Sequence, residues 1–341
     1  MPHNDSTHPT DLSRRSFLAT TAAFPFAGLI GCAAAKSSDA ALASAASHAT
    51  GDASEPCLCF AHLTDSHLQP ERGGARGTAA CLEHVQSLAR KPDFIMTGGD
   101  NVMDVFEAKQ GRATELAQAF RSTWKQHCSL PVEHTLGNHD IFGWNKPKSG
   151  TSGSEADWGK KFACDLYGFP RTYRSFDRAG WRFIVLDSVQ SKGDGYVAFI
   201  DPEQLAWLEQ TLKDTPATMP ICVVSHIPIL CVSAMVFGNP RSLEKRGQDT
   251  IVQAGEMHTD GDHLHHLFKR HGGVKLCLSG HIHLLDRCQI DGITYICDGA
   301  VSGNWWKGPI QGTPEGYGVV DLWADGRFEH RYQPYGWKAE A

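Results

Sequence analysis

Short apolar runs alternate with polar, often glycine-flanked segments from about residue 58 onward. Runs this short, rich in Val, Ile and Phe, predict buried β-strands, whereas apolar positions three or four residues apart predict helices. The predicted strands are Leu58–Leu63, Phe94–Met96, Val132–Leu136, Phe183–Leu186, Ile221–Val224 and Val274–Leu278. The predicted helices are Ala79–Ala89, Ala113–Trp124, Pro202–Leu212 and Asp260–Arg270, the third of them capped by Asp201.

The last part of the chain changes to antiparallel hairpins. Two Asp-Gly pairs, each a signal for a tight turn, separate apolar runs there. They are Asp291-Gly292, between Leu284–Ile290 and Ile293–Cys297, and Asp325-Gly326, between Tyr317–Trp323 and Phe328–Tyr332. The whole pattern predicts one layered domain, of the α+β or α/β class, in which helices enclose two sheets.

Composition narrows the functional classes. The chain is 41% hydrophobic and 21% charged, close to globular averages, which excludes global disorder. Its net charge of −6 gives no basic surplus, so a nucleic-acid polymer is not expected as partner. The chain has 18 histidines, residues that bind metals and transfer protons near neutral pH. Four of them predict an exposed polar face or a secondary metal patch on the last helix: His263, His265, His266 and His271.

The N-terminus has the pattern of an export signal. Arg14-Arg15, followed by Phe17 and an apolar run to Ile30, resembles a twin-arginine signal. The run is too short to span a bilayer as a helix but suits the apolar region of a signal peptide. We therefore expect a signal peptide over 1–31 and the twin-arginine translocon as a partner during export. The alternative is a mobile N-terminus with a chance arginine pair.

The end of this signal resembles a lipobox. The sequence Leu-Ile-Gly-Cys ends at Cys32, which predicts cleavage before Cys32 and lipidation of its thiol, enough for stable membrane anchoring. Residues 33–55 are mostly Ala and Ser, typical of a flexible tether. We expect a tether over 32–56 and a folded domain over 57–341, exported and lipid-anchored. The alternative is a chance Cys beside an ordinary signal.

Ten of the 11 cysteines remain once Cys32 is removed. An even number in an exported chain permits disulfides. However, Cys59, Cys222 and Cys277 lie inside apolar runs, where free Cys behaves as a small buried hydrophobe. Twin-arginine export also carries proteins that are already folded, so we do not expect a disulfide framework.

Five polar clusters follow predicted strands. They are Asp65-Ser66-His67, Gly99-Asp100-Asn101, Gly137-Asn138-His139-Asp140, Ser225-His226 and Gly280-His281-Ile282-His283. Each alone occurs by chance in many proteins, and Gly-Asn also suits an ordinary turn. Together they converge at the carboxyl ends of strands, where open α/β sheets bind ligands. Asp, His and Asn supply the oxygen and imidazole ligands that divalent transition metals take.

The order of these five motifs resembles the calcineurin-like metallophosphoesterase family, over residues from about 57 to 300. The resemblance implies a four-layer αββα sandwich with two mixed β-sheets and two divalent metal ions. It implies Asp65, His67 and His283 at the first metal, and Asp100 bridging both. It implies Asn138, His226 and His281 at the second. His139 would stand beside the phosphoryl group, with Asp140 orienting its ring.

The chemistry that the resemblance implies is phosphoester hydrolysis by a metal-bound hydroxide. Two cations neutralise the anionic ester, clamp the attacking and departing oxygens, and lower the pKa of bound water. His139 is the candidate proton donor to the departing oxygen. Purple acid phosphatases place an iron-binding tyrosine three residues after the bridging Asp, whereas this chain has Met103 there. This argues against a tyrosine-to-iron site, and the identity of the metals stays open among Mn, Fe and Zn.

The sequence indicates the substrate less clearly than it indicates the metal site. The hairpin over Tyr173–Asp187 and the Pro202–Leu212 helix look most like the bacterial class III cyclic-nucleotide phosphodiesterase branch, which favours a small-molecule phosphodiester. The alternatives are a phosphomonoesterase such as a nucleotidase, and a surface lipoprotein without catalysis. A monoesterase should cap the third phosphate oxygen with basic groups, for which the candidates are Lys146, Lys148, Arg241 and Arg246. Four tryptophans either stack on a substrate or pack in the fold: Trp144, Trp158, Trp305 and Trp306.

Overall fold

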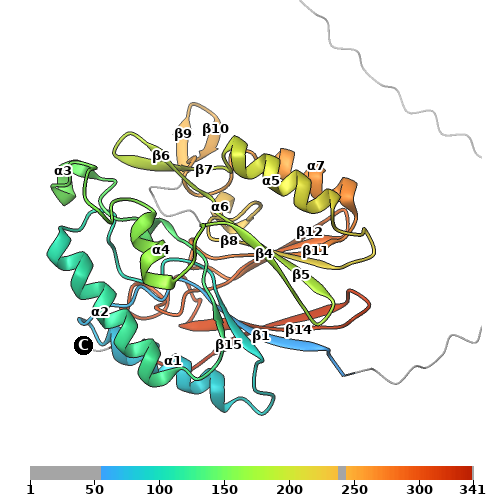
Figure 1. Cartoon of the computed structure of the whole chain (residues 1–341), viewed down its shortest axis with the longest axis horizontal. Helices are drawn as coiled ribbons and strands as arrows, with labels where there is room; N and C mark the ends of the chain where they lie inside the picture. Colours follow the sequence, from blue (N-terminus) through green and yellow to red (C-terminus); the bar gives the residue numbers. More distant parts are fainter. Residues whose placement is uncertain (1–54, 237–242, 340–341) are drawn as a thin grey trace, which may run out of the picture. The chain divides into compact units, whose positions relative to one another are not determined.

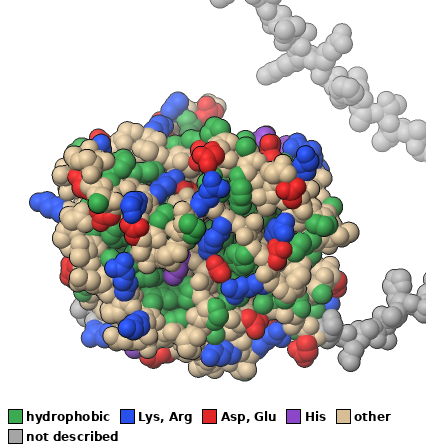
Figure 2. Space-filling view, in the orientation of Figure 1, with side chains coloured by type: hydrophobic (Ala, Val, Ile, Leu, Met, Phe, Trp, Pro, Cys, Tyr) green, Lys and Arg blue, Asp and Glu red, His purple; other side chains and the backbone are tan. Residues whose placement is uncertain are grey.

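A computed structural model describes residues 55–236 and 243–339 (Figure 1). The predicted signal peptide, Cys32 and most of the tether lie outside the described residues, as does Arg241. No helix in the described ranges is long and apolar enough to cross a membrane. On the face drawn in Figure 2, basic and acidic side chains are interspersed and do not form a patch of one sign.

The first sheet has five strands in the order β15-β14-β1-β2-β3. Its members are β1 (Leu58–Leu63), β2 (Phe94–Thr97), β3 (Val132–Glu133), β14 (Gly316–Leu322) and β15 (Phe328–Pro334). β1, β2 and β3 run parallel, whereas β14 and β15 are antiparallel to their neighbours, so the sheet is mixed.

The second sheet has six strands in the order β12-β13-β11-β8-β5-β4. They are β4 (Arg174–Arg178), β5 (Trp181–Leu186), β8 (Ile221–Ser225), β11 (Val274–Ser279), β12 (Asp286–Ile290) and β13 (Ile293–Cys297). The four inner strands run parallel, and the edge strands β12 and β4 close antiparallel hairpins. Both predicted Asp-Gly turns connect hairpins, β12–β13 and β14–β15, as expected.

The sheets pack face to face, and a pair of helices covers the outer side of each (Figure 1). Side chains from inner faces of both sheets form the central core, with Phe60 and Phe94 facing Phe183. Helices α1 (Gly74–Ser87) and α2 (Gln110–His127) pack on the first sheet, and α5 (Pro202–Lys213) and α7 (Gly261–His271) pack on the second. This arrangement confirms the predicted four-layer sandwich.

The predicted cap of the third helix is present. Asp201 accepts a hydrogen bond from the Gln204 amide at 2.9 Å, and Pro202 opens the first turn of α5, where its missing N–H costs nothing. Leu208 and Leu212 are buried against the second sheet. The strand predicted over Val132–Leu136 pairs only over Val132–Glu133, because beyond this the chain turns into the Asn138 segment.

Several elements lack a clear sequence signal. They are the hairpins β6 (Val189–Lys192) with β7 (Gly195–Ala198) and β9 (Leu243–Arg246) with β10 (Asp249–Val252), the short helices α3 (Lys146–Ser149), α4 (Lys161–Tyr167) and α6 (Ser233–Val236), and the 3-10 turn Asn138–Asp140. All of them are three to seven residues long. They are too short for hydrophobic periodicity to develop.

The histidines of α7 do not all form an exposed face. His265 is buried, and its ring nitrogens contact the Tyr295 hydroxyl at 2.8 Å and an Asp291 carboxylate oxygen at 3.1 Å. His266 is exposed and bonds within its own helix to the Asp262 carbonyl. Among the described residues, the groups able to hold a metal ion lie elsewhere. Cys59, Cys222 and Cys277 are buried as expected, and the ten described cysteines are free thiols.

Candidate metal centre

The predicted ligands follow strands whose carboxyl ends meet on one side of the two sheets. Parallel strands β1 and β2 lead into Asp65 and Asp100, and parallel strands β8 and β11 lead into His226 and His281. The Asp65 amide donates to the Gly99 carbonyl at 3.0 Å, which ties the loops of the first sheet together. The His281 amide donates to Asp65 Oδ2 at 2.8 Å and ties the two sheets together.

Two motif glycines stand where no side chain fits. A Cβ on Gly280 would lie 1.8 Å from Thr64 Oγ1 and 2.2 Å from Asp65 Oδ2. A Cβ on Gly137 would lie 2.1 Å from Asp100 Oδ1. Because non-bonded atoms do not approach so closely, any other residue would displace a predicted ligand. Gly280 and Gly137 therefore have to be glycine because their backbones lie directly against the carboxylates of Asp65 and Asp100.

The first half of the centre contains Asp65, His67 and His283, all buried. Nε2 of His283 lies 3.0 Å from His67 Nε2 and 3.2 Å from Asp65 Oδ1. The Nδ1 atoms face backbone carbonyls, Met103 for His67 at 3.2 Å and Gly303 for His283 at 2.6 Å. A carbonyl only accepts hydrogen bonds, so both Nδ1 atoms carry the proton and, in the neutral rings, both Nε2 atoms are acceptors.

With both rings neutral, three acceptors face one another without a donor: Nε2 of His67, Nε2 of His283 and Oδ1 of Asp65. Burial, together with the nearby His139, lowers the pKa of His67 to about 3, so its ring is neutral at pH 7. Asp65 Oδ1 is buried without a hydrogen-bond partner. Buried acceptors that converge in this way repel one another unless a cation lies between them. The donor set therefore fits a divalent metal ion that takes oxygen and imidazole ligands.

The second half contains Asp100, Asn138, His226 and His281. Nε2 of His226 lies 3.2 Å from Asp100 Oδ1, 3.1 Å from Asn138 Oδ1 and 3.3 Å from His281 Nδ1. Its Nδ1 donates to the Gly98 carbonyl at 2.8 Å, which leaves Nε2 aimed at the other ligands. Burial disfavours the charged ring, but the carboxylates of Asp100 and Asp65 outweigh it and raise the pKa of His226 to about 9.

Asp100 faces both halves. Its Oδ1 approaches His226, and its Oδ2 lies 3.7 Å from His67 Nε2 in the first half. Burial raises the pKa of Asp100, but the surrounding histidines, His226 first, lower it well below its usual range. A carboxylate that stays ionised and presents one oxygen to each side suits the predicted bridging role. The structure thus brings all seven predicted ligands together, while their coordination stays a prediction.

The backbone at these ligands has an unusual conformation. Five of the seven predicted ligands have positive φ angles: Asp65 (53°), His67 (39°), Asp100 (50°), His281 (70°) and His283 (62°). Residues other than glycine rarely adopt this left-handed region. Such strain persists where the surrounding structure fixes it, and it concentrates at functional sites.

His139 stands at the rim of the centre with a quarter-exposed side chain (25%). Its Nδ1 donates to the Met103 carbonyl at 2.7 Å, and its Nε2 lies 3.9 Å from Asp100 Oδ2. Burial lowers the pKa of His139, but the carboxylates of Asp100 and Asp104 outweigh this and raise it above its ordinary value. The ring can therefore carry a proton, as predicted for a general acid. His67, Asp100 and His139 also form a group close enough to hold an ion.

Asp140 does not orient the ring of His139, so this prediction was wrong. Its Oδ1 accepts from the amides of Asn101 and Val102 and from the Tyr167 hydroxyl, and its Oδ2 accepts from the Gly137 amide. The carboxylate turns inward because these buried donors need an acceptor. Asp140 therefore joins the Asp100 loop to the Asn138 turn, and the Met103 carbonyl fixes the ring of His139 instead.

Two acidic residues at the rim were not predicted. Asp104 Oδ1 lies 3.8 Å from His139 Nδ1. Glu256 Oε2 lies 3.9 Å from His281 Nε2, a buried atom without a hydrogen-bond partner. Asp104 follows Met103 closely and could have been suspected from its neighbours. Glu256 stands far along the chain in a segment with no motif, so no sequence signal points to it.

Of the four tryptophans singled out in the sequence, three pack within the fold and one lies with its ring beside the predicted metal ligands. Trp306 is buried and donates to the His67 carbonyl at 2.9 Å, and Trp144 packs against Phe106. Trp158 donates to the Gly143 carbonyl under Lys146. The centroid of the Trp305 ring lies 4.6 Å from that of the His283 ring and 5.9 Å from that of the His67 ring. Trp305 is thus the one of the four that contacts two predicted ligands through its ring.

Comparison with protein families identifies the class of protein that this fold and centre define. The family model described as calcineurin-like phosphoesterase matches residues 59–285. The chain therefore belongs to the calcineurin-like phosphoesterase family, a family of metal-dependent phosphoester hydrolases. The comparison with curated proteins gives no match.

Among solved structures, the chain resembles a dimetal phosphatase from Danio rerio with a TM-score of 0.55 at 15% identity, covering 82% of this chain and 97% of that one. It also matches the anchor in the inner membrane complex of Plasmodium (TM-score 0.49, 16% identity, 83% and 86% covered). A third match is phosphopantetheinyl hydrolase from Mycobacterium tuberculosis (TM-score 0.45, 14% identity, 72% and 90% covered). At these identities the first likeness supports the fold alone.

Proposed function

We propose that the protein is a dinuclear-metal phosphodiesterase acting on a small-molecule phosphoester. The observation that carries this proposal is the pair of buried acceptor groups, one around His283 and one around His226, that share the carboxylate of Asp100. When bound, two divalent ions there would neutralise a phosphoester and acidify water. The cyclic-nucleotide phosphodiesterase branch remains the proposed relationship within the family.

The residues of the chain have separate tasks in this proposal. Asp100 keeps its negative charge and spaces the two halves. The Met103 carbonyl holds the proton on Nδ1 of His139, so Nε2 is the atom that gives a proton to the departing alkoxide. An alkoxide needs this proton because it is a poor leaving group. The ring of Trp305 packs beside the rings of His283 and His67 and supplies an apolar surface next to the first half.

The surroundings of the centre favour a diester over a monoester. A monoester dianion carries one more negative charge and needs extra basic groups. Lys148 instead pairs with Glu107 at 2.7 Å, Lys146 donates to the Ser152 carbonyl, and Arg246 pairs with Glu244. The carboxylates of Asp104 and Glu256 stand at the rim and repel a dianion more than a monoanion.

Hydrolysis of a substrate panel tests the proposal. The panel contains bis-p-nitrophenyl phosphate, p-nitrophenyl phosphate, cyclic AMP and glycerophosphodiesters, each with Mn, Fe or Zn added. We expect higher kcat/KM for diesters, and no turnover from an Asp100→Asn control. Faster hydrolysis of p-nitrophenyl phosphate would favour the phosphomonoesterase or nucleotidase alternative. A metal-loaded protein without turnover on any ester would favour the non-catalytic surface lipoprotein.

We further propose an exported, lipid-anchored protein, from the Arg14-Arg15 pair and the lipobox ending at Cys32. Cys32→Ser should release the protein from membranes, whereas Arg14→Lys with Arg15→Lys should block export. Fractionation followed by mass spectrometry of the N-terminus measures both effects. Wild-type protein found in the cytosol with residues 1–31 intact would contradict the proposal.

A further inference from the structure

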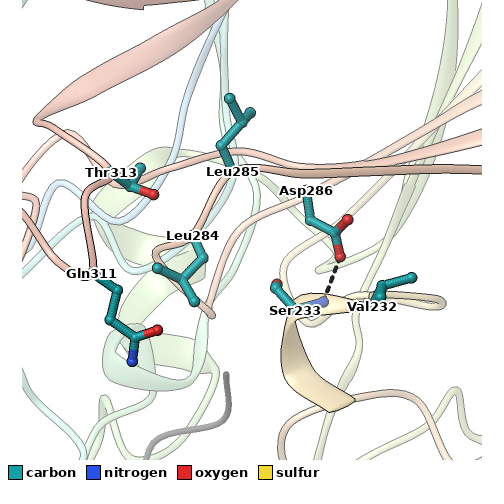
Figure 3. Close-up of a pocket in the computed structure, with 7 residues that line it drawn as sticks. All are labelled: Val232, Ser233, Leu284, Leu285, Asp286, Gln311 and Thr313. Atoms are coloured by element: carbon teal, nitrogen blue, oxygen red, sulfur yellow. Dashed lines mark hydrogen bonds between the residues drawn. The ribbon is translucent and has the colours of Figure 1, made fainter. Parts of the chain in front are cut away.

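Exposed hydrophobic side chains gather at one place on the domain. Among the described residues, five large hydrophobic side chains are strongly exposed: Val232 (47%), Met235 (45%), Val236 (59%), Leu285 (45%) and Ile290 (44%). The first three lie together at α6, and Leu285 lines the same pocket as Val232 (Figure 3). Only Ile290 lies apart, at the end of β12. Clustered apolar surface of this kind indicates a binding site more often than scattered single residues do.

The pocket between these segments has a volume of about 250 Å³. Figure 3 shows the seven residues that line it: Val232, Ser233, Leu284, Leu285, Asp286, Gln311 and Thr313. The Asp286 carboxylate accepts from the Ser233 amide at 2.6 Å, drawn as a dashed line, and joins the two walls. This bond fixes the width of the pocket.

The residues on each wall of the pocket are linked, along the chain or by packing, to predicted metal ligands. Leu284 and Leu285 directly follow His283, a predicted ligand of the first half. Ile282, between His281 and His283, packs against the cluster that contains Ala234 of α6. Gln311 and Thr313 follow the segment whose Trp305 ring lies 4.6 Å from the ring of His283. The pocket therefore adjoins the metal centre through Leu284, the chain neighbour of the predicted ligand His283.

Among the described residues, the charge of the lining disfavours a second phosphate. Asp286 is the charged residue among the seven, and a carboxylate repels an anion. The three aliphatic lining residues, Val232, Leu284 and Leu285, supply apolar contact. The pocket therefore suits an uncharged hydrocarbon substituent.

We propose that this pocket binds the hydrocarbon part of an amphiphilic phosphoester, while the phosphoryl group lies at the metal centre. The inference rests on the proposed phosphodiesterase function and names its substrate class: esters with an alkyl or acyl chain on one side of phosphorus. Burial of each methylene out of water stabilises the complex, so affinity should grow with chain length.

A series of p-nitrophenyl alkyl phosphates, from methyl to hexyl, tests the inference because the leaving group stays constant. We expect wild-type kcat/KM to rise by up to about fourfold per methylene, the fold-change that ~0.8 kcal/mol gives. The hexyl-to-methyl ratio should fall strongly in Leu285→Ser and in Val232→Ser. Ile290→Ser, which removes the exposed side chain that lies apart, is the matched control and should keep the wild-type ratio.

The outcomes separate this inference from the proposed function. Turnover of all esters with no dependence on chain length would overturn the pocket and leave the phosphodiesterase standing. If no ester is hydrolysed, calorimetric titration of the metal-loaded protein with methyl- and hexylphosphonate decides. Tighter hexylphosphonate binding that is lost in Leu285→Ser would still support the pocket, and equal binding would overturn it. A dimer that Leu285→Ser converts to monomers would also overturn it, because a second copy would then cover the patch.

Discussion

The metal centre and a second buried cluster both combine histidines with aspartates. Only in the second cluster does every carboxylate oxygen have a hydrogen-bond donor. In the second cluster, His62 Nδ1 donates to Asp298 Oδ2 at 2.7 Å, and His330 Nε2 donates to Asp298 Oδ1 at 2.9 Å. The Asp298 carboxylate is fully buried. Burial raises its pKa, but His330 and His62 outweigh this and lower it well below its usual range. Each carboxylate oxygen here therefore has its own proton donor.

The metal centre lacks this balance. There the ring protons of His67, His226 and His283 are directed to backbone carbonyls, and the other nitrogens face carboxylates and one another. Residue composition alone does not separate the two clusters. What separates them is the donors that face the carboxylates: both oxygens of Asp298 have one, whereas Asp65 Oδ1 has none. Where donors are missing, a bound cation would satisfy the acceptors.

The largest effect is expected from Asp100→Asn. The amide removes the charge that faces both halves, so bound metal should fall and turnover should drop to the level measured without metal. Elemental analysis and hydrolysis of bis-p-nitrophenyl phosphate measure the two effects. A wild-type protein that holds fewer than about one ion per chain after reconstitution would contradict the two-metal arrangement.

His139→Ala should keep the metals but reduce turnover by about 10²–10⁴-fold. The loss should be greater for an alkyl diester than for bis-p-nitrophenyl phosphate, because nitrophenolate departs without a proton. Equal losses on both esters would indicate that His139 stabilises charge and donates no proton. Loss of metal with activity would show that His139 is itself a ligand.

Asp298→Asn provides the counterpart in the second cluster. The amide removes the buried charge that accepts the ring N–H groups of His62 and His330, and hydrogen bonds to a charged group contribute about 1.5–3 kcal/mol each. We expect a corresponding decrease in the free energy of unfolding, measured with urea, while metal stoichiometry stays at the wild-type value. A variant of normal stability that has lost its metals would mean that the two clusters are not distinct in kind.

Glu256→Gln tests the support of the second half. For His281 to bind an ion through Nδ1, its proton must lie on Nε2, which faces Glu256 Oε2 at 3.9 Å. Carboxylates behind metal-binding histidines typically contribute about 10–100-fold to affinity. Competition with a chromophoric chelator should show this loss for one ion, and Glu244→Gln, on the exposed hairpin β9–β10, should show none. Unchanged affinity would remove Glu256 from the site.

The smallest effect concerns a histidine without a carboxylate partner. Burial, followed by the charge of Arg174, lowers the pKa of His134 to about 3. His134 takes up a proton near pH 6.5 in the unfolded chain but not in the folded chain. The free energy of unfolding therefore falls as the pH decreases from about 6.5 to about 3. The slope from this residue is at most about 1.4 kcal/mol per pH unit. His134→Phe keeps the contact with Tyr167 and should reduce the slope; equal slopes in both proteins would refute this.

The sequence was sufficient to predict the sandwich because long, strongly patterned elements carry it. The Leu58–Leu63 run and the Pro202 helix contain the strand and helix patterns in full, and the Asp-Gly pairs identify two hairpins. The seven predicted ligands were assigned from the resemblance of their motifs to the family, and each follows such a strand within a few residues. Their meeting point is then a consequence of parallel strands ending on one side.

Other parts depend on contacts that no local pattern records. The orientation of Asp140 is set by donors on Asn101 and Tyr167, far from it in the chain. Glu256 reaches His281 from the turn that follows the hairpin β9–β10, a segment too short to have a periodicity. The apolar pocket exists because Leu285 and Val232 are brought together by folding, although each looks like an ordinary exposed residue in the sequence.

The left-handed backbone at the predicted ligands has a consequence for protein engineering. At Asp65, Asp100 and His283 the side chain is useful only in a conformation that costs an L-residue roughly 1–2 kcal/mol. A designer who copies the side chains onto another scaffold, with relaxed loops, would aim them in different directions. Replacement by glycine would relieve the backbone but delete the ligand, so consensus stabilisation has no room at these positions. Transplanting this centre therefore requires the ends of both sheets, and any gain in stability must come from elsewhere in the domain.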